Sequence, residues 1–292
     1  MTDRDALNLT ERPLRVLHLS DTHIYGDESL HYGIVDTVAA LARTLDRAEP
    51  IENIDVVVLS GDLSDDMSTG SYERLRDIVE PWAARHEAVV VYAMGNHDRA
   101  AEFERVLGPR TGATEVRGVR ILRLDSAVPE AGYGHVDDEQ LHWLRRELDA
   151  ASGPSLVVVH HPPTPAYGPL LKALELQNPR ELLAVCAAGG ATAVLSGHYH
   201  HSLVSRENGV PVIVAPGIAN TSDACAPAGH ERATIGSGFA IIDVPAAGSP
   251  VVTFIAAPSE RDGAEIFNLE PADVDRIGRA AGPPSRAGTG SA

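Results

Sequence analysis

The order of apolar and helical segments predicts an α/β fold. In the first two thirds of the chain, short runs rich in Val and Leu alternate with longer segments of helical period, which is typical of layered α/β domains. After about residue 200, apolar runs follow one another without long helices between them. We therefore expect this half to add more strands, in a second sheet that faces the first.

Several predicted strands are apolar on consecutive residues, which suits strands buried on both faces of a sheet. The predicted strands of the first part are 14–20, 55–60, 88–93, 119–125, 155–160 and 192–196. The segments between them that have the period of amphipathic helices are 34–47, 71–85 and 137–151. The last of these begins with three acidic residues, which suit the positive end of a helix dipole.

The second half is expected to contain four more strands, at 202–206, 211–215, 238–244 and 251–255. Asn208-Gly209 between the first two of them predicts a hairpin. The segment 221–238, which includes His230, is expected to be an irregular insertion and is a candidate wall of the substrate pocket. We interpret 1–13 as an N-terminal extension, 14–258 as a single domain and 259–292 as a C-terminal segment, whose Gly/Pro/Ser-rich tail from about residue 282 is expected to be disordered.

Composition excludes several classes of protein. The formal net charge is -17, which argues against stable nucleic-acid binding and against an anionic membrane as a partner. Two cysteines, Cys186 and Cys225, are too few for a disulfide framework or a cysteine-based metal site. The N-terminus lacks the apolar core of a signal peptide, and no run is long enough to span a membrane. We expect a soluble, cytoplasmic protein with Cys186 as a buried free thiol.

Residues of metal-binding types follow five of the predicted strands. They are Asp21 and His23, then Asp62 and Asp65, then Asn96, His97 and Asp98, then His160 and His161, and finally His198, His200 and His201. The carboxyl ends of strands are the usual position of a site in an α/β sheet. One histidine after a strand is more often structural, but five strand ends with the same pattern favour a metal site.

Glycines precede several of these candidates, at Gly61, Gly95 and Gly197. Glycine allows a sharp turn and a close approach of the backbone, so the next side chain can point at a common centre. Each glycine alone is weak evidence, because strand-to-helix turns often contain one.

The types of ligand indicate which metals would bind. Histidine nitrogen with carboxylate and amide oxygen, and no thiolate, suits Fe, Mn, Zn or Co and does not suit a cysteine-rich structural zinc site. Seven strong candidates exceed the needs of one ion, and a bridging carboxylate would explain the surplus. Two divalent ions ~3.5–4 Å apart can bind phosphate oxygens and activate a water for in-line attack.

The motifs together resemble the signature of the calcineurin-like metallophosphoesterase superfamily, over residues 14 to about 200. The matching motifs are Asp21-x-His23, Gly61-Asp62, Gly95-Asn96-His97-Asp98, His160 and Gly197-His198-x-His200. The resemblance implies a four-layer α/β/β/α sandwich of two facing mixed sheets. It also implies one metal ion on Asp21, His23, Asp62 and His200, and a second on Asp62, Asn96, His160 and His198.

The resemblance also implies roles for residues that do not bind metal. His97 corresponds to the family's non-ligand histidine, which contacts the phosphate and is a candidate donor of a proton to the leaving oxygen. Asp65 is expected either to orient His97 or to cap a helix. Adjacent residues of an extended strand point in opposite directions, so we do not expect His161 or His201 to bind metal, and we expect Tyr199 to point away.

Further segments resemble the class III bacterial cyclic nucleotide phosphodiesterases, in particular the mycobacterial cyclic AMP phosphodiesterase branch. They include Leu124-Asp125-Ser126, Gly134-His135-Val136-Asp137 and Leu176-Gln177-Asn178-Pro179. This resemblance implies hydrolysis of 3′,5′-cyclic nucleotides, most of all cyclic AMP, by attack of a metal-bound hydroxide. It also favours a homodimer.

Three alternatives stay open. The same metal site suits a glycerophosphodiesterase, or a phosphodiesterase or phosphomonoesterase of broad specificity. A non-enzymatic scaffold of the same fold is disfavoured, because every ligand position of the motif is filled.

Overall fold

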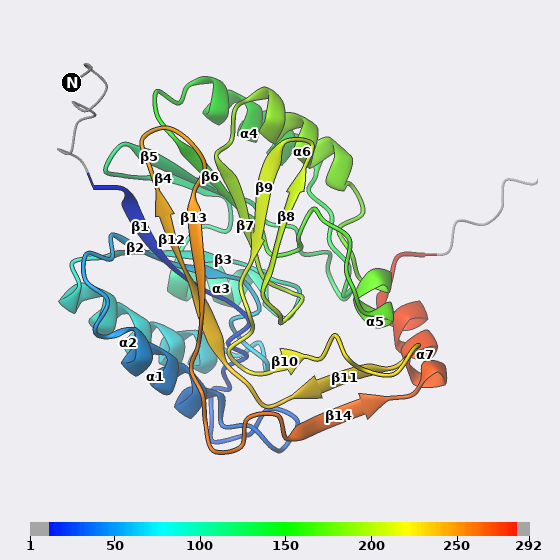
Figure 1. Ribbon diagram of the computed structural model, residues 1–292. Helices are drawn as coiled ribbons and strands as arrows, with labels where there is room; N and C mark the ends of the chain where they lie inside the picture. Colours follow the sequence, from blue (N-terminus) through cyan, green and yellow to red (C-terminus); the bar gives the residue numbers. More distant parts are fainter. Residues whose placement is uncertain (1–11, 285–292) are drawn as a thin grey trace, which may run out of the picture.

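The computed structural model describes residues 12–284 and contains two large mixed sheets and one small sheet (Figure 1). The first large sheet has the strand order β13 (Val251–Ala256), β12 (Gly238–Val244), β1 (Leu14–Leu19), β2 (Val56–Ser60) and β3 (Val89–Ala93). Strands β1, β2 and β3 are parallel, whereas β12 is antiparallel to both of its neighbours. The carboxyl ends of β1, β2 and β3 therefore meet at one edge.

The second large sheet has four parallel strands in its centre, between two antiparallel edge strands. Its order is β4 (Gly112–Val116), β5 (Val119–Arg123), β6 (Ser155–Val158), β7 (Ala193–Ser196), β9 (Val210–Val214) and β8 (Leu203–Glu207). The small sheet is antiparallel, in the order β10 (Thr221–Ser222), β11 (Glu231–Thr234) and β14 (Glu265–Leu269).

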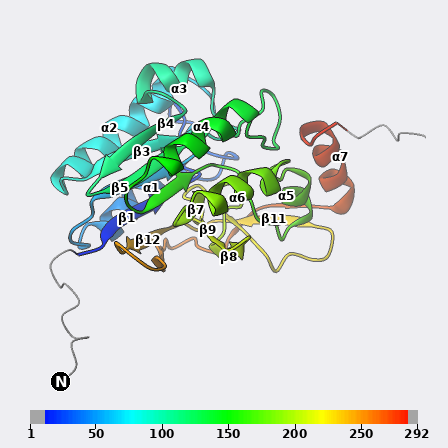
Figure 2. The same ribbon diagram turned by 90° about the horizontal axis from the view of Figure 1, so that it is seen from above.

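Helices cover the outer faces of both large sheets, on opposite sides of the molecule in Figure 1. The first sheet is covered by α1 (Thr37–Ala48), α2 (Thr69–Arg85) and α3 (Ala100–Leu107). The second is covered by α4 (Asp138–Asp149), α5 (Pro169–Ala173) and α6 (Pro179–Ala188). The last helix, α7 (Pro271–Ala281), packs beside α5 at one end of the molecule, as Figure 2 also shows.

Alternation along the strands separates the core into three layers. In β2, Val56 and Val58 face the second sheet, whereas Val57 and Leu59 pack against the helices. In β6, Leu156 and Val158 face the first sheet in the same way. Successive side chains of a strand point to opposite faces, so apolar residues at every position fill both interfaces. The result is the expected four-layer α/β/β/α sandwich.

Most of the predicted elements are present within one or two residues of their expected bounds. Asn208 and Gly209 both have positive φ, of 47° and 83°, as a tight hairpin between β8 and β9 requires. Helix α4 begins as expected, because the Asp137 carboxylate accepts from Gln140 N at 2.8 Å. Cys186 is a buried free thiol, as predicted, and Cys225 is exposed.

The prediction for 221–238 was wrong in one respect, because this segment contains β10 and β11. Strand β11 pairs with β14, more than thirty residues later in the chain, and such a distant partner has no local sequence signal. Most of the proposed N-terminal extension, and residues 285–292 of the proposed tail, lie outside the described residues. Among residues 12–284, no helix is long and apolar enough to cross a membrane.

Candidate metal centre

The predicted metal-binding side chains converge where the ends of β1, β2, β3, β6 and β7 meet. Four of them, Asp21, His23, Asp62 and His200, place ligand atoms within 4.8 Å of one another. His200 Nε2 lies 3.2 Å from Asp21 Oδ1, and His23 Nε2 lies 3.8 Å from Asp62 Oδ2. Two strands of one sheet and one of the other therefore bring two buried carboxylates and two histidines together.

Asp62 also contacts the remaining candidates. Its Oδ2, the oxygen that also faces His23, lies 3.2 Å from His160 Nε2, and its Oδ1 accepts from His97 N at 2.8 Å. His198 lies beside His160, with ring centroids 5.2 Å apart. Asn96 lines the same cavity of about 130 Å³ as Asp62 and His198. The Asp62 carboxylate is thus the side chain that joins the two groups of candidates.

Hydrogen bonds leave one nitrogen of each of three histidines free toward the centre. His23 Nδ1 lies 2.8 Å from Asp65 Oδ1, His160 Nδ1 lies 2.8 Å from Ser60 O, and His198 Nε2 lies 3.1 Å from Leu174 O. Because these oxygens accept, each of the three nitrogens carries the proton. The opposite nitrogen is then the one that can bind a metal ion, which is the arrangement of metal-binding histidines.

Orphaned polar atoms test whether metal ions fit here. Within residues 12–284, His23 Nε2, His160 Nε2 and Asn96 Oδ1 are buried and lack a hydrogen-bond partner. Buried polar atoms are normally paired, and buried carboxylates need a compensating charge. Divalent cations at this position would satisfy both requirements, so the residues fit the implied metals.

The electrostatics of the centre are dominated by its two carboxylates. Burial alone would raise the pKa of Asp62, but the neighbouring His160 and His97 hold it well below its usual range. Burial alone would lower the pKa of His160, but Asp62 and Asp21 raise it to about 9. The cluster therefore strongly favours positive charge beside its carboxylates.

Five of the candidate ligands have a strained backbone conformation. The left-handed φ region is occupied by Asp21 (54°), His23 (44°), Asp62 (51°), His198 (67°) and His200 (51°). Each such conformation costs a residue with a Cβ about 1–3 kcal/mol and is typical of functional sites. Surrounding hydrogen bonds hold the strained turns, for example His23 N to Asp62 O at 3.0 Å.

The glycines before the ligands are required by close packing, as the sequence indicated. A Cβ on Gly95 would lie 2.2 Å from Asp62 Oδ1, and one on Gly197 would lie 1.8 Å from Ser20 Oγ. Gly61 has a φ of 104°, and a Cβ there would meet His160 Nδ1 at 2.5 Å. The strand ends can approach one another only because these three side chains are absent.

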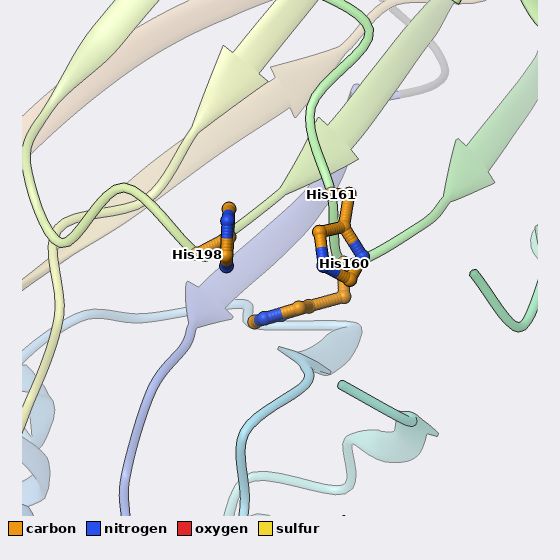
Figure 3. Close-up of side chains that lie close together, drawn as sticks. All are labelled: His160, His161 and His198. Atoms are coloured by element: carbon orange, nitrogen blue, oxygen red, sulfur yellow. The ribbon is translucent and has the colours of Figure 1, made fainter. Parts of the chain in front are cut away.

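His161 lies beside the centre with both ring nitrogens occupied. Figure 3 shows its ring near those of His160 and His198. Its Nδ1 is 2.8 Å from Ser126 Oγ and its Nε2 is 3.1 Å from Gly132 O. His160, His161 and His198 place ring nitrogens within 4.8 Å of one another, but a histidine with two hydrogen-bonded nitrogens has no lone pair free for a metal ion. His161 therefore stays outside the expected set of ligands.

Two neighbouring residues also point elsewhere. Tyr199 is fully buried and donates through its hydroxyl to Thr164 O at 2.7 Å. The ring of His201 stacks on Tyr199 and does not line the metal cavity.

Asp65 lies closer to His23 than to His97, the residue that it was expected to orient. Its carboxylate is within hydrogen-bond distance of His23 Nδ1, whereas His97 Nδ1 lies 3.9 Å away. It does not cap α2 either, because Ser68 accepts from Ser71 N at that position. Asp65 therefore orients a predicted metal ligand, and the side chain of His97 is half exposed and less constrained.

Asp98 holds two ligand-bearing loops together. Its buried carboxylate accepts from Leu63 N, Ser64 N and Gly95 N at 2.9–3.1 Å. Burial and then the negative charge of Asp62 raise the pKa of Asp98 to about 6. It does not line the metal cavity, and its carboxylate oxygens are occupied by backbone amides of the two loops.

Several residues of the cavity were not predicted from the sequence. His31 Nδ1 lies 3.4 Å from Asp65 Oδ1, and His31 Nε2 lies 3.0 Å from Asn220 Nδ2. Glu231 and Ser222 line the cavity, so part of the segment 221–238 does form its wall. His230 does not, because its ring faces Asn268 instead. None of these residues follows a strand of the two large sheets, so the strand-end pattern could not indicate them.

Comparison with known proteins agrees with this geometry. The calcineurin-like phosphoesterase family model matches residues 14–202, the stretch that holds every predicted metal ligand. The chain is 35% identical over 235 residues to a probable cyclic nucleotide phosphodiesterase of Rhodococcus erythropolis, an alignment that covers 76% of each protein. It is 34% identical over 231 residues to a cAMP/cGMP dual specificity phosphodiesterase of Mycobacterium tuberculosis, which covers 76% of this chain and 73% of that protein.

A solved structure extends the likeness of the fold to the whole sandwich. A purple acid phosphatase from seeds of yellow lupin (Lupinus luteus) superposes with a TM-score of 0.58, over 94% of this chain and 57% of that one, at 12% identity. An identity this low concerns the fold alone. Family model, relatives and fold agree with one another, and the chain belongs to the calcineurin-like phosphoesterase family.

Proposed function

We propose that this protein is a dinuclear metallophosphodiesterase that hydrolyses 3′,5′-cyclic nucleotides, most of all cyclic AMP. The observation that carries the proposal is the convergence of side chains from five strand ends at the Asp62 carboxylate, where His23, Asn96 and His160 leave buried polar atoms unpaired. The names of the two bacterial relatives support the choice of substrate.

The proposed ligand sets share one carboxylate. Asp21, His23, Asp62 and His200 hold one ion, and Asp62, Asn96, His160 and His198 hold the other. The position of Asp62 Oδ2, 3.8 Å from His23 Nε2 and 3.2 Å from His160 Nε2, supports its role as the bridge. The nitrogen and oxygen donors suit Fe, Mn, Zn or Co. When bound, the ions supply charge for the phosphate oxygens and lower the pKa of a water.

The chain itself contributes order and a proton. Asp65 and the carbonyls of Ser60 and Leu174 hold three histidine rings in one orientation, so little reorganisation is needed during the reaction. His97 follows the predicted ligand Asn96, but its ring is half exposed and lines the cavity, so it is not one of the buried side chains proposed to bind metal. In this proposal His97 contacts the phosphate and protonates the oxygen that leaves phosphorus.

The alternative substrate, the oligomeric state and the location do not follow from the geometry of the metal centre. A glycerophosphodiester, or a wider range of phosphoesters, is the main alternative substrate for the same metal centre. A homodimer is proposed from the family resemblance. A cytoplasmic location is proposed because cyclic nucleotides are intracellular messengers, and two free cysteines suit a reducing compartment.

A substrate panel tests the proposal. Cyclic AMP, 2′,3′-cyclic AMP, glycerophosphodiesters and p-nitrophenyl esters are compared by kcat/KM with Mn or Fe present. We expect cyclic AMP to give the highest value and exhaustive chelation to abolish all turnover. A clearly higher kcat/KM for glycerophosphodiesters would move the assignment to that class. Absence of turnover on every ester, with metal bound, would favour the scaffold.

A further inference from the structure

The cavity at the metal centre is too small for a whole nucleotide. Its volume is about 130 Å³, whereas pockets for small organic ligands typically measure ~300–1,000 Å³. Metal-binding side chains line much of it, among them His23, Asp62, His198 and His200. There is room for a phosphate group, and the organic part of any phosphodiester must extend into a neighbouring space.

A larger cavity adjoins the metal centre along Asn96 and His97. Its volume is about 670 Å³, and both residues line it as well as the metal cavity. One wall comes from Met67 and Arg99, near the starts of α2 and α3, and the opposite wall from residues 127–132, which follow β5. It therefore lies between the loops of the two sheets and opens onto the predicted metal ligands.

The lining suits a flat, mainly apolar ring system with polar edges. Two of the chain's three methionines, Met67 and Met94, line the cavity together with Val128 and Pro129. Methionine adapts to irregular ligand surfaces and contacts aromatic rings through its sulfur. Arg99 Nη2 lies 3.9 Å from Met67 Sδ. Arg110, which also lines the cavity, pairs with Glu104 and Asp125, whereas the Arg99 guanidinium forms no ion pair within residues 12–284. In a chain of net charge -17, an arginine without a carboxylate partner is available for a ligand.

The chemistry of the reaction selects this side of the metal centre. When a cyclic nucleotide is hydrolysed, a water oxygen bonds to phosphorus, one phosphorus–oxygen bond to the ribose breaks, and the ribose oxygen takes a proton. The ribose therefore lies next to the proton donor. His97, the proposed donor, is one of the two residues that the two cavities share. A rival cavity of about 410 Å³ adjoins the metal centre only at Glu231, away from His97.

We propose that the 670 Å³ cavity binds the nucleoside part of the substrate, with the base between Met67 and residues 127–132 and with Arg99 against the base. This inference rests on the proposed function. It assigns Arg99 and Met67 as residues that determine affinity for the base, and it assigns no new chemical step.

Two variants test the assignment from opposite directions. Arg99→Ala removes the cation, and Val128→Trp fills part of the cavity. Arg105→Ala is the matched control, because Arg105 is an exposed arginine of α3 that does not line the cavity. We expect KM for cyclic AMP to rise about tenfold in both test variants, with kcat changed less than about twofold. We expect kcat/KM for methyl p-nitrophenyl phosphate, which has no purine, to change much less.

Binding of the product provides a second measurement that does not depend on turnover. Calorimetric titration with adenosine 5′-monophosphate should show about tenfold weaker binding to Arg99→Ala and Val128→Trp, and unchanged binding to Arg105→Ala. Unchanged KM and unchanged affinity in both test variants would overturn the assignment and point to the cavity beside Glu231. If wild type hydrolyses generic phosphodiesters but not cyclic AMP, the proposed substrate fails. The assignment of the 670 Å³ cavity to the nucleoside is then still tested by calorimetry. If the wild-type protein does not bind adenosine 5′-monophosphate, that assignment is wrong.

Discussion

Replacement of Asp65 by alanine is predicted to weaken metal binding although Asp65 is not a proposed ligand. Its Oδ1 accepts the proton of His23 Nδ1 at 2.8 Å and lies 3.4 Å from His31 Nδ1, and Tyr25 donates to its Oδ2. Without the carboxylate, the His23 ring loses the bond that directs Nε2 toward Asp62. The metal ion would then have to order the His23 ring as it binds, and this cost lowers the metal affinity.

The size of the effect follows from one charge-assisted hydrogen bond. Such bonds contribute about 1.5–3 kcal/mol, and partners that orient metal-binding histidines typically change metal affinity 10–100-fold. Asp65 is mostly buried, so we expect the upper part of this range for Asp65→Ala. Asp65→Asn keeps an acceptor for His23 but loses the charge, and we expect a decrease of about tenfold.

Competition calorimetry with Mn²⁺ and a chelator measures both affinities. Asp77→Asn is the matched control, because Asp77 is an exposed carboxylate of α2 that pairs with Arg76. Its metal affinity should equal that of wild type. If Asp65→Ala binds metal as tightly as wild type does, the orientation of His23 by Asp65 does not contribute to metal binding.

Three other predictions concern turnover and stability. His97→Ala should keep its metal content while kcat falls ~10²–10⁴-fold, and unchanged turnover would remove His97 from catalysis. Gly197→Ala should lower the free energy of unfolding by about 3 kcal/mol in chemical denaturation, because the new Cβ would lie 1.8 Å from Ser20 Oγ. An unchanged free energy of unfolding would show that the strand ends can move apart. Burial alone would raise the pKa of Asp55, but hydrogen bonds from Arg12 and Arg15 hold it below 3.8. The ionised Asp55 therefore stabilises the folded protein at neutral pH, and this stabilisation is lost as pH falls through the lowered pKa. Asp55→Asn should cost about 1–2 kcal/mol at pH 7 and progressively less toward pH 3; an equal cost at both pH values would contradict this linkage.

The positions of most strands and the gathering of the predicted ligands could be predicted because their signals are local. Each ligand follows an apolar strand within four residues, as in Leu59-Ser60-Gly61-Asp62, and parallel strands must end at the same edge. The glycine before Asp62 gave a further local sign of a turn. The pairing of the strands then brings together residues as distant in sequence as Asp21 and His200.

The walls of the site were not predictable in the same way. His31 and Glu231 lie in segments whose neighbours in the cavity are far apart in the chain, so neither has a nearby motif. Which histidine Asp65 contacts depends on how the turns after β1, β2 and β3 lie against one another. The spacing of residues in the sequence alone does not distinguish His23 from His97. The left-handed conformations of five predicted ligands also depend on tertiary hydrogen bonds, since even Asp and His, which adopt this region more often than most residues, do so only in a small fraction of cases.

The shared role of Asp62 and the count of two ions are tested most directly by titrating metal into chelated protein while cyclic AMP hydrolysis is measured. We expect no turnover without metal, and activity that becomes maximal at two equivalents of Mn²⁺ per chain. The variant Asp62→Ala should bind neither ion tightly and should stay inactive when two equivalents of Mn²⁺ per chain are added. Full turnover in the chelated protein, or maximal activity at a single equivalent, would contradict the two-metal centre.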